Sequence, residues 1–163
     1  MPKINIANAP TSVGAGYPVP FDAPCLGRRR WALGDVAGLT QFGVNLLRLP
    51  PSQWSSQRHW HLAEDEFVYV LEGEVVLVTD AGEQAMGPGD CAGFRAGAAD
   101  GHHLQNRSDK EAVLLEVGSR RPDDDAGAYP DIDLALPTRR SDYTHKDGTP
   151  YPAKIIAPTR KVV

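Results

Sequence analysis

The sequence predicts an all-β protein built as a single domain. Its 163 residues include 16 glycines and 14 prolines, which break the chain into short apolar runs. This punctuation favours many short strands joined by turns over a helical bundle. No stretch shows the 3.6-residue periodicity of a long amphipathic helix. A chain of this length buries one real core and is short for two domains.

Residues 1–27 are expected to form an irregular N-terminal arm. They are rich in Pro, Ala and Gly, and this proline density resists both helix and central strand. The arm carries Tyr17, Val19 and Phe21. We expect these side chains to dock either on the domain or on a second subunit.

The β-domain itself is expected over residues 28–118. Its first hairpin pairs 28–33 with 40–49, and the second strand ends at Pro50. Further strands are expected around the histidines at 59–61 and at 67–71, 74–79, 83–86, 91–94, 102–106 and 112–117. Residues 80–82, 88–90 and 108–110 have turn composition. Residues 119–163 are charged and poor in apolar runs, which predicts an irregular tail packed on the domain.

The segment His59-Trp60-His61 places two histidines at positions i and i+2. In an extended strand both imidazoles lie on one face. Four residues later Glu66 begins the next apolar run, so its carboxylate returns toward the imidazoles from a neighbouring strand. Imidazoles and a carboxylate that converge from rigid strands form a ligand set for a divalent transition metal.

These residues resemble the cupin superfamily. His59, His61, Glu66 and Gly73 match its first motif, and the segment from Gly82 to Asn106 resembles its second. The resemblance implies a cupin-type antiparallel β-barrel, also described as a jelly roll. It also implies that His102 is a third imidazole ligand of the metal.

The resemblance leaves several functions open. Three imidazoles and one carboxylate leave two positions on a six-coordinate Mn, Fe, Co or Ni ion, and few or none on a four-coordinate Zn. A metal-dependent enzyme on a small polar metabolite is expected first, with sugar or sugar-phosphate isomerisation or epimerisation as its reaction. An Fe-dependent dioxygenase and a non-catalytic module that senses a small ligand are the alternatives. No general base is identified by spacing.

Gln57 has the same strand parity as His59 and His61. It is therefore the candidate substrate-binding residue. Its side chain would point into the metal cavity or orient a metal ligand.

Charge and apolar content indicate which kinds of partner the chain binds. The net charge of −4 argues against nucleic acid as a main partner. No apolar run approaches the length of a membrane span and no signal peptide is recognised, so we expect a cytoplasmic protein. Homodimerisation is also expected, because single-domain cupins commonly pair.

Overall fold

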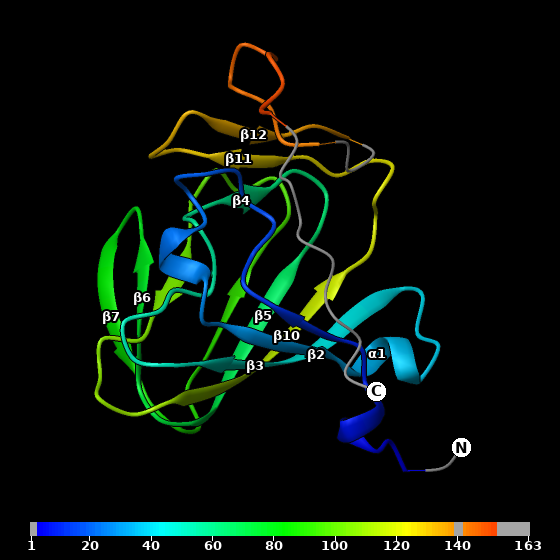
Figure 1. The fold of residues 1–163 in the computed structure, drawn as a ribbon, viewed down its shortest axis with the longest axis vertical. Coiled ribbons are helices and arrows are strands. Elements are labelled where there is room, and N and C mark those ends of the chain that lie inside the picture. The colour runs from blue at the N-terminus through cyan, green and yellow to red at the C-terminus, as the bar shows by residue number, and fades with distance from the viewer. Residues whose placement is uncertain (1–2, 139–141, 153–163) are drawn as a thin grey trace.

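The computed structural model describes residues 3–138 and 142–152, so parts of the predicted arm and tail lie outside the described residues. Every strand pair is antiparallel. The largest sheet has six strands in the order β1 (Thr11–Val13), β2 (Arg29–Ala32), β3 (Phe42–Leu49), β10 (Ala112–Ser119), β5 (Glu66–Glu72) and β8 (Cys91–Phe94) (Figure 1).

Two three-stranded sheets complete the β structure of residues 3–138 and 142–152. One has the order β7 (Gly82–Met86), β6 (Val75–Thr79) and β9 (His103–Gln105), and the other has the order β12 (Leu134–Leu136), β11 (Gly127–Tyr129) and β4 (Trp60–His61). Helical structure is limited to η1 (Ile6–Asn8), η2 (Ala23–Cys25) and α1 (Leu33–Val36) in the described residues. The all-β prediction is confirmed. The hydrogen-bonded strands of the described residues form facing sheets of a jelly roll and not one closed ring.

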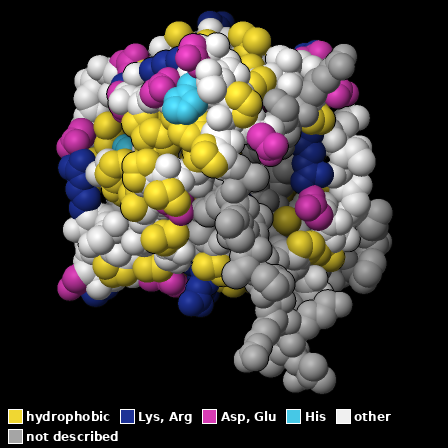
Figure 2. All heavy atoms as spheres, turned by 45° about the horizontal axis from the view of Figure 1, so that its top comes forward, with side chains coloured by type: hydrophobic (Ala, Val, Ile, Leu, Met, Phe, Trp, Pro, Cys, Tyr) yellow, Lys and Arg dark blue, Asp and Glu magenta, His cyan; other side chains and the backbone are white. Residues whose placement is uncertain are grey.

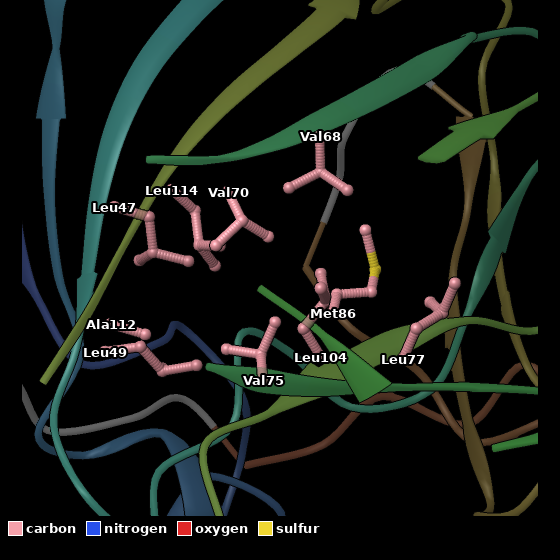
Figure 3. Packing of buried hydrophobic residues seen from close by; sticks show 10 residues of the cluster. All are labelled: Leu47, Leu49, Val68, Val70, Val75, Leu77, Met86, Leu104, Ala112 and Leu114. Atoms are coloured by element: carbon pink, nitrogen blue, oxygen red, sulfur yellow. The ribbon is translucent and has the colours of Figure 1, made fainter. Parts of the chain in front are cut away.

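The main core lies between the six-stranded sheet and the β7-β6-β9 sheet (Figure 3). Alternate residues of each strand point inward, as Val68 and Val70 of β5 show. The same alternation turns Glu66 toward the interior at the start of β5. Ten buried apolar side chains form this core: Leu47, Leu49, Val68, Val70, Val75, Leu77, Met86, Leu104, Ala112 and Leu114.

The terminal segments contain more regular structure than the sequence predicts. β1 pairs with β2 from within the expected arm, while β11 and β12 form a sheet with β4 from within the expected tail. These strands have three residues each, too few for a strand period to stand out. Tyr17 and Phe21 of the arm pack on the domain beside Tyr129. The domain boundaries drawn from the sequence stay a prediction.

The surface carries both kinds of charge. On the face shown in Figure 2, Lys and Arg side chains are scattered among acidic ones and border an area where hydrophobic side chains gather. Within the described residues, no helix has the length and apolar character needed to cross a bilayer.

Candidate metal centre

The four predicted metal ligands come from three strand regions that the fold brings together. His61 lies in β4 and Glu66 opens β5. His59 precedes β4, and it forms an isolated antiparallel bridge with His102, which precedes β9. The two backbone hydrogen bonds of this bridge hold the histidine backbones in register across the gap between sheets.

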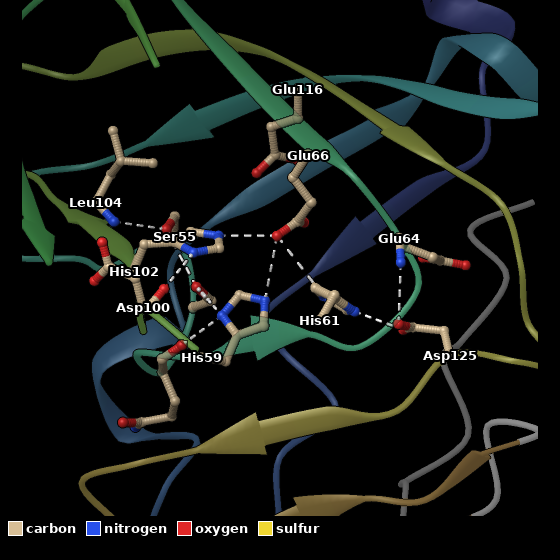
Figure 4. A network of polar contacts seen from close by, with 12 residues as sticks. Ser55, His59, His61, Glu64, Glu66, Asp100, His102, Leu104, Glu116 and Asp125 are labelled. Atoms are coloured by element: carbon tan, nitrogen blue, oxygen red, sulfur yellow. Dashed lines mark hydrogen bonds and ion pairs between the residues drawn. The ribbon is translucent and has the colours of Figure 1, made fainter. Parts of the chain in front are cut away.

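All three imidazoles direct Nε2 at the same carboxylate oxygen, Glu66 Oε2 (Figure 4). The distance is 2.9 Å from His102, 3.7 Å from His61 and 3.8 Å from His59. Two donors on one ion lie no further apart than two metal–ligand bonds of about 2.1 Å each, or ~4.2 Å. The donor atoms of His59, His61 and Glu66 therefore lie close enough to one another to hold one metal ion, while His102 Nε2 approaches only Glu66 Oε2 this closely.

Hydrogen bonds at Nδ1 set the tautomers of two imidazoles. His59 Nδ1 lies 2.9 Å from the carbonyl oxygen of Gln57, and His61 Nδ1 lies 2.6 Å from Asp125 Oδ2. A carbonyl or ionised carboxylate oxygen can only accept, so each Nδ1 carries the proton and donates it. Nε2 is then the nitrogen with a free lone pair, as a metal ligand requires.

His102 is oriented mainly by its ring contacts. Its ring stacks on Phe94 with ring centroids 3.5 Å apart and planes at 1°. Its Nδ1 lies 3.4 Å from the carbonyl oxygen of Asp100, which is a long contact. The stacked ring of Phe94 leaves the His102 Nε2 directed at Glu66.

Asp125 is a site residue that the sequence reasoning missed. Its side chain is buried at 2% exposure. While Oδ2 accepts from His61, Oδ1 accepts from the backbone N–H groups of Ala63 and Glu64, at 2.9 and 3.2 Å. These bonds fix the carboxylate and, through it, the His61 ring. Asp125 is the last of three consecutive aspartates, and nothing local distinguishes it from the other two.

The protonation states in the site suit metal binding. Burial alone would raise the pKa of Glu66, but the hydrogen bond from His102 and the charges of the three histidines lower it to about 2. Burial is the main cause that lowers the pKa of His59 to about 4; Glu66 raises this pKa, and His61 and His102 lower it. An ionised carboxylate and a neutral imidazole are the forms that coordinate a metal.

The four side chains line a cavity of about 430 Å³. Its wall also carries two further carboxylates, Glu64 and Glu116. A smaller cavity of about 240 Å³ reaches His61, Glu66 and His102 from another side. Small molecules therefore have space beside the donor cluster.

Gln57 occupies a different position from the one that strand parity suggests. Its side-chain Nε2 donates to the carbonyl oxygen of Phe21 at 2.6 Å, so it faces the N-terminal segment. Residues 55–58 are bends and not strand, and side-chain alternation does not extend to them. Gln57 contributes to the site through its backbone carbonyl at His59. A direct contact between Gln57 and substrate stays a prediction.

Comparison with known proteins places the chain in a family. A profile of the Cupin domain matches residues 45–118. A crystallised sugar phosphate isomerase of the cupin superfamily from Silicibacter pomeroyi is 45% identical, with 93% of this chain and 98% of that chain covered and a TM-score of 0.85. A candidate sugar phosphate isomerase from Acidithiobacillus ferrooxidans is 31% identical, with coverages of 72% and 74% and a TM-score of 0.67.

More distant matches share the fold alone. A polyketide cyclase from Streptomyces resistomycificus is 21% identical, with 75% of this chain and 82% of that chain covered and a TM-score of 0.59. The search of curated proteins found no match. The domain profile and the extended similarity to the Silicibacter protein show that this chain belongs to the cupin superfamily.

Proposed function

We propose that the protein is a metal-dependent isomerase of a small sugar phosphate, with one divalent metal held by His59, His61, Glu66 and His102. The observation that carries the proposal is the convergence of three Nε2 atoms on Glu66 Oε2 inside a cavity. The names of the similar Silicibacter and Acidithiobacillus proteins support the substrate class. A bound divalent metal would supply Lewis-acid polarisation of a substrate carbonyl or hydroxyl oxygen.

Isomerisation also needs a group that moves a proton between neighbouring carbons, and Glu116 is a candidate for it. It lies on β10 at the inward parity of Ala112 and Leu114 and lines the cavity. Arg30 Nη2 donates to its Oε1 at 3.1 Å, and Arg30 Nε lies 2.8 Å from its Oε2 in the same ion pair, which orients the side chain. A positioned carboxylate is a suitable general base.

Glu64 is a second cavity carboxylate, but it is more constrained. Its side chain is buried, and its Oε1 accepts from the backbone N–H of Arg121 at 2.6 Å. Its own backbone N–H binds Asp125. Glu64 thus ties the turn before β5 to the segment that contains Asp125, so we assign the proton transfer to Glu116.

The cavity volume bounds the substrate. At about 430 Å³ it falls within the roughly 300–1,000 Å³ of sites that bind small molecules. A monosaccharide phosphate fits this range.

Turnover assays on metal-reconstituted protein test the proposal. Protein stripped with chelator would be loaded separately with Mn, Fe, Co, Ni or Zn and incubated with aldose and ketose phosphates of three to six carbons in D₂O. We expect one pair to interconvert with deuterium incorporation at the carbon that exchanges its proton. His61→Ala and His102→Ala should abolish both conversion and incorporation.

Two results would replace this proposal by one of its alternatives. Oxygen consumption coupled to substrate loss in the Fe-loaded protein would indicate a dioxygenase. Ligand binding that depends on His61, without turnover under any of the metals, would indicate a sensing module.

A further inference from the structure

Arg28 is a buried cation without a carboxylate partner among the described residues. It lies between η2 and β2 and is 9% exposed. Its Nε donates to the carbonyl oxygen of Gly14 at 3.1 Å, and its Nη1 donates to the carbonyl oxygen of Ser55. Both acceptors are neutral, so the guanidinium charge is not balanced by these contacts.

The other arginines of the cavity wall differ from Arg28 in this respect. In the described residues the wall contains three arginines. Arg30 forms an ion pair with Glu116, and Arg120 forms one with Asp35. Arg28 alone of these three reaches the cavity without an ion pair in the described part of the chain.

A buried and unbalanced charge is costly, so its retention indicates a partner. Burial lowers the pKa of Arg28 and the charge of Arg30 lowers it further, while Glu116, the ion-pair partner of Arg30, raises it by less. A guanidinium has five N–H donors, and the two carbonyl contacts use two of them. The remaining donors suit bidentate binding of an oxyanion.

Arg28 and the candidate metal centre line one cavity, and contacts through residues 55 and 56 connect them. Arg28 binds the backbone of Ser55, the neighbouring Ser56 Oγ lies 3.4 Å from His59 Nδ1, and the Tyr129 ring stacks on His59 with centroids 5.7 Å apart. Tyr17, whose ring meets the edge of Tyr129 at 5.8 Å, also lines the cavity. A small ligand in this space can contact both Arg28 and the histidines.

We infer that Arg28 is the specificity-determining residue that binds the phosphate group of the substrate, while the other end of the substrate reaches His59, His61 and Glu66. This inference rests on the proposed function for the identity of the substrate. The binding of phosphate at Arg28 does not depend on metal, and this permits a separate test.

The test measures the affinity of inorganic phosphate for metal-free protein by calorimetry, against potassium chloride at matched ionic strength. Removing the metal ensures that phosphate does not bind through it. We expect Arg28→Gln to weaken phosphate binding at least about tenfold, as expected when a charged, bidentate donor is lost. The matched control is Arg120→Gln, which removes a cavity arginine that already has an ion pair. The phosphate affinity of this variant should stay within about twofold of the wild-type value.

Three outcomes would overturn the inference: no phosphate binding by the wild-type protein, equal affinity in Arg28→Gln, or equal losses in the Arg28 and Arg120 variants. If Arg28→Gln fails to fold, the phosphate affinity of Arg28→Lys tests the inference instead. Lysine keeps the charge but cannot donate the bidentate pair of hydrogen bonds. Wild-type affinity in Arg28→Lys would contradict the inference. Phosphate binding that requires Arg28 in a protein with no isomerase activity would defeat only the proposed function.

Discussion

His61 and Asp125 are 64 positions apart in the sequence, yet His61 Nδ1 donates to Asp125 Oδ2 across 2.6 Å. The aspartate is buried, so the carboxylate has little freedom to turn away from the ring. A metal-ligating histidine is oriented by such a partner on its second nitrogen. The relationship connects the segment after β10 with the candidate metal centre.

Asp125→Asn should weaken metal binding by about 10–100-fold. The amide either turns an N–H group toward the His61 N–H or gives up its backbone contacts. Competition with a chelator of known affinity measures the effect. The matched control is Asp124→Asn, since Asp124 is exposed and pairs with Arg121. Equal metal affinity in the two variants would show that the Asp125 contact does not support the site.

Glu116→Gln should lower kcat by about 10²–10⁴-fold, because it removes the proposed proton-transfer group. Metal content should stay unchanged, since Glu116 is not one of the four proposed ligands. Glu111→Gln is the control, because Glu111 pairs with Arg48 on the more exposed part of the same sheet. Steady-state kinetics with quantified metal separates the two effects. A Glu116→Gln enzyme with the wild-type rate would remove this residue from the mechanism.

Metal-free protein should lose stability as the pH falls from 6.5 toward 4. The pKa of His59 is about 4 in the folded protein, against 6.5 ordinarily. Between these values the unfolded chain binds a proton that the folded protein does not, so acidification favours unfolding. The full effect of this group is about 3 kcal/mol. Urea denaturation at several pH values measures it.

His59→Gln is the control for the pH prediction, because glutamine does not titrate. This variant should show a shallower decline in the free energy of unfolding between pH 6.5 and 4.5. Below pH 4.5 Glu66 adds a second loss of stability, because the unfolded chain takes up a proton that the folded protein, with a Glu66 pKa of about 2, does not. Parallel curves for wild type and His59→Gln above pH 4.5 would argue against a depressed His59 pKa.

Homodimerisation stays a prediction, and the structure suggests a surface for it. Tyr17 and Phe21 pack on their own domain, so they are not left to contact a partner. Tyr69 and Leu71 point outward from β5 and are 37% and 42% exposed. Sedimentation should give about twice the chain mass of 17.6 kDa. Tyr69→Glu should lower the measured mass toward that of the monomer. Val19→Glu, at an exposed site in the arm, should leave the mass unchanged.

A mass near 17.6 kDa for the wild-type protein at micromolar concentration would rule out the dimer. A dimer lost in Val19→Glu but retained in Tyr69→Glu would place the interface at the arm and not at the outer face of β5.

The sequence could predict the all-β class and the convergence of the main site residues because both depend on local rules. Strand alternation places His59 beside His61, and the turn before Glu66 brings the carboxylate back to them. His102 was predicted from a motif resemblance. Strand alternation relates only residues that are close in sequence, and His102 is too far along the chain from His61. Its bridge to His59 is a tertiary contact.

The remaining parts of the site depend on tertiary contacts that no local pattern records. Asp125 and Arg28 occur in charged runs that resemble solvated surface, and burial of one member of each run follows only from the packing of distant segments. For Gln57, a local pattern was present but placed the side chain incorrectly. Its parity suggested the cavity, but bends at residues 55–58 turn its side chain to Phe21.

Elemental analysis of the purified protein shows whether the proposed centre holds a metal ion. Wild type and His61→Ala would be purified in parallel without chelator, with circular dichroism to confirm that both are folded. We expect close to one divalent metal ion per wild-type chain and a large loss in His61→Ala. Equal metal content in the two proteins would contradict a centre formed by His59, His61, Glu66 and His102.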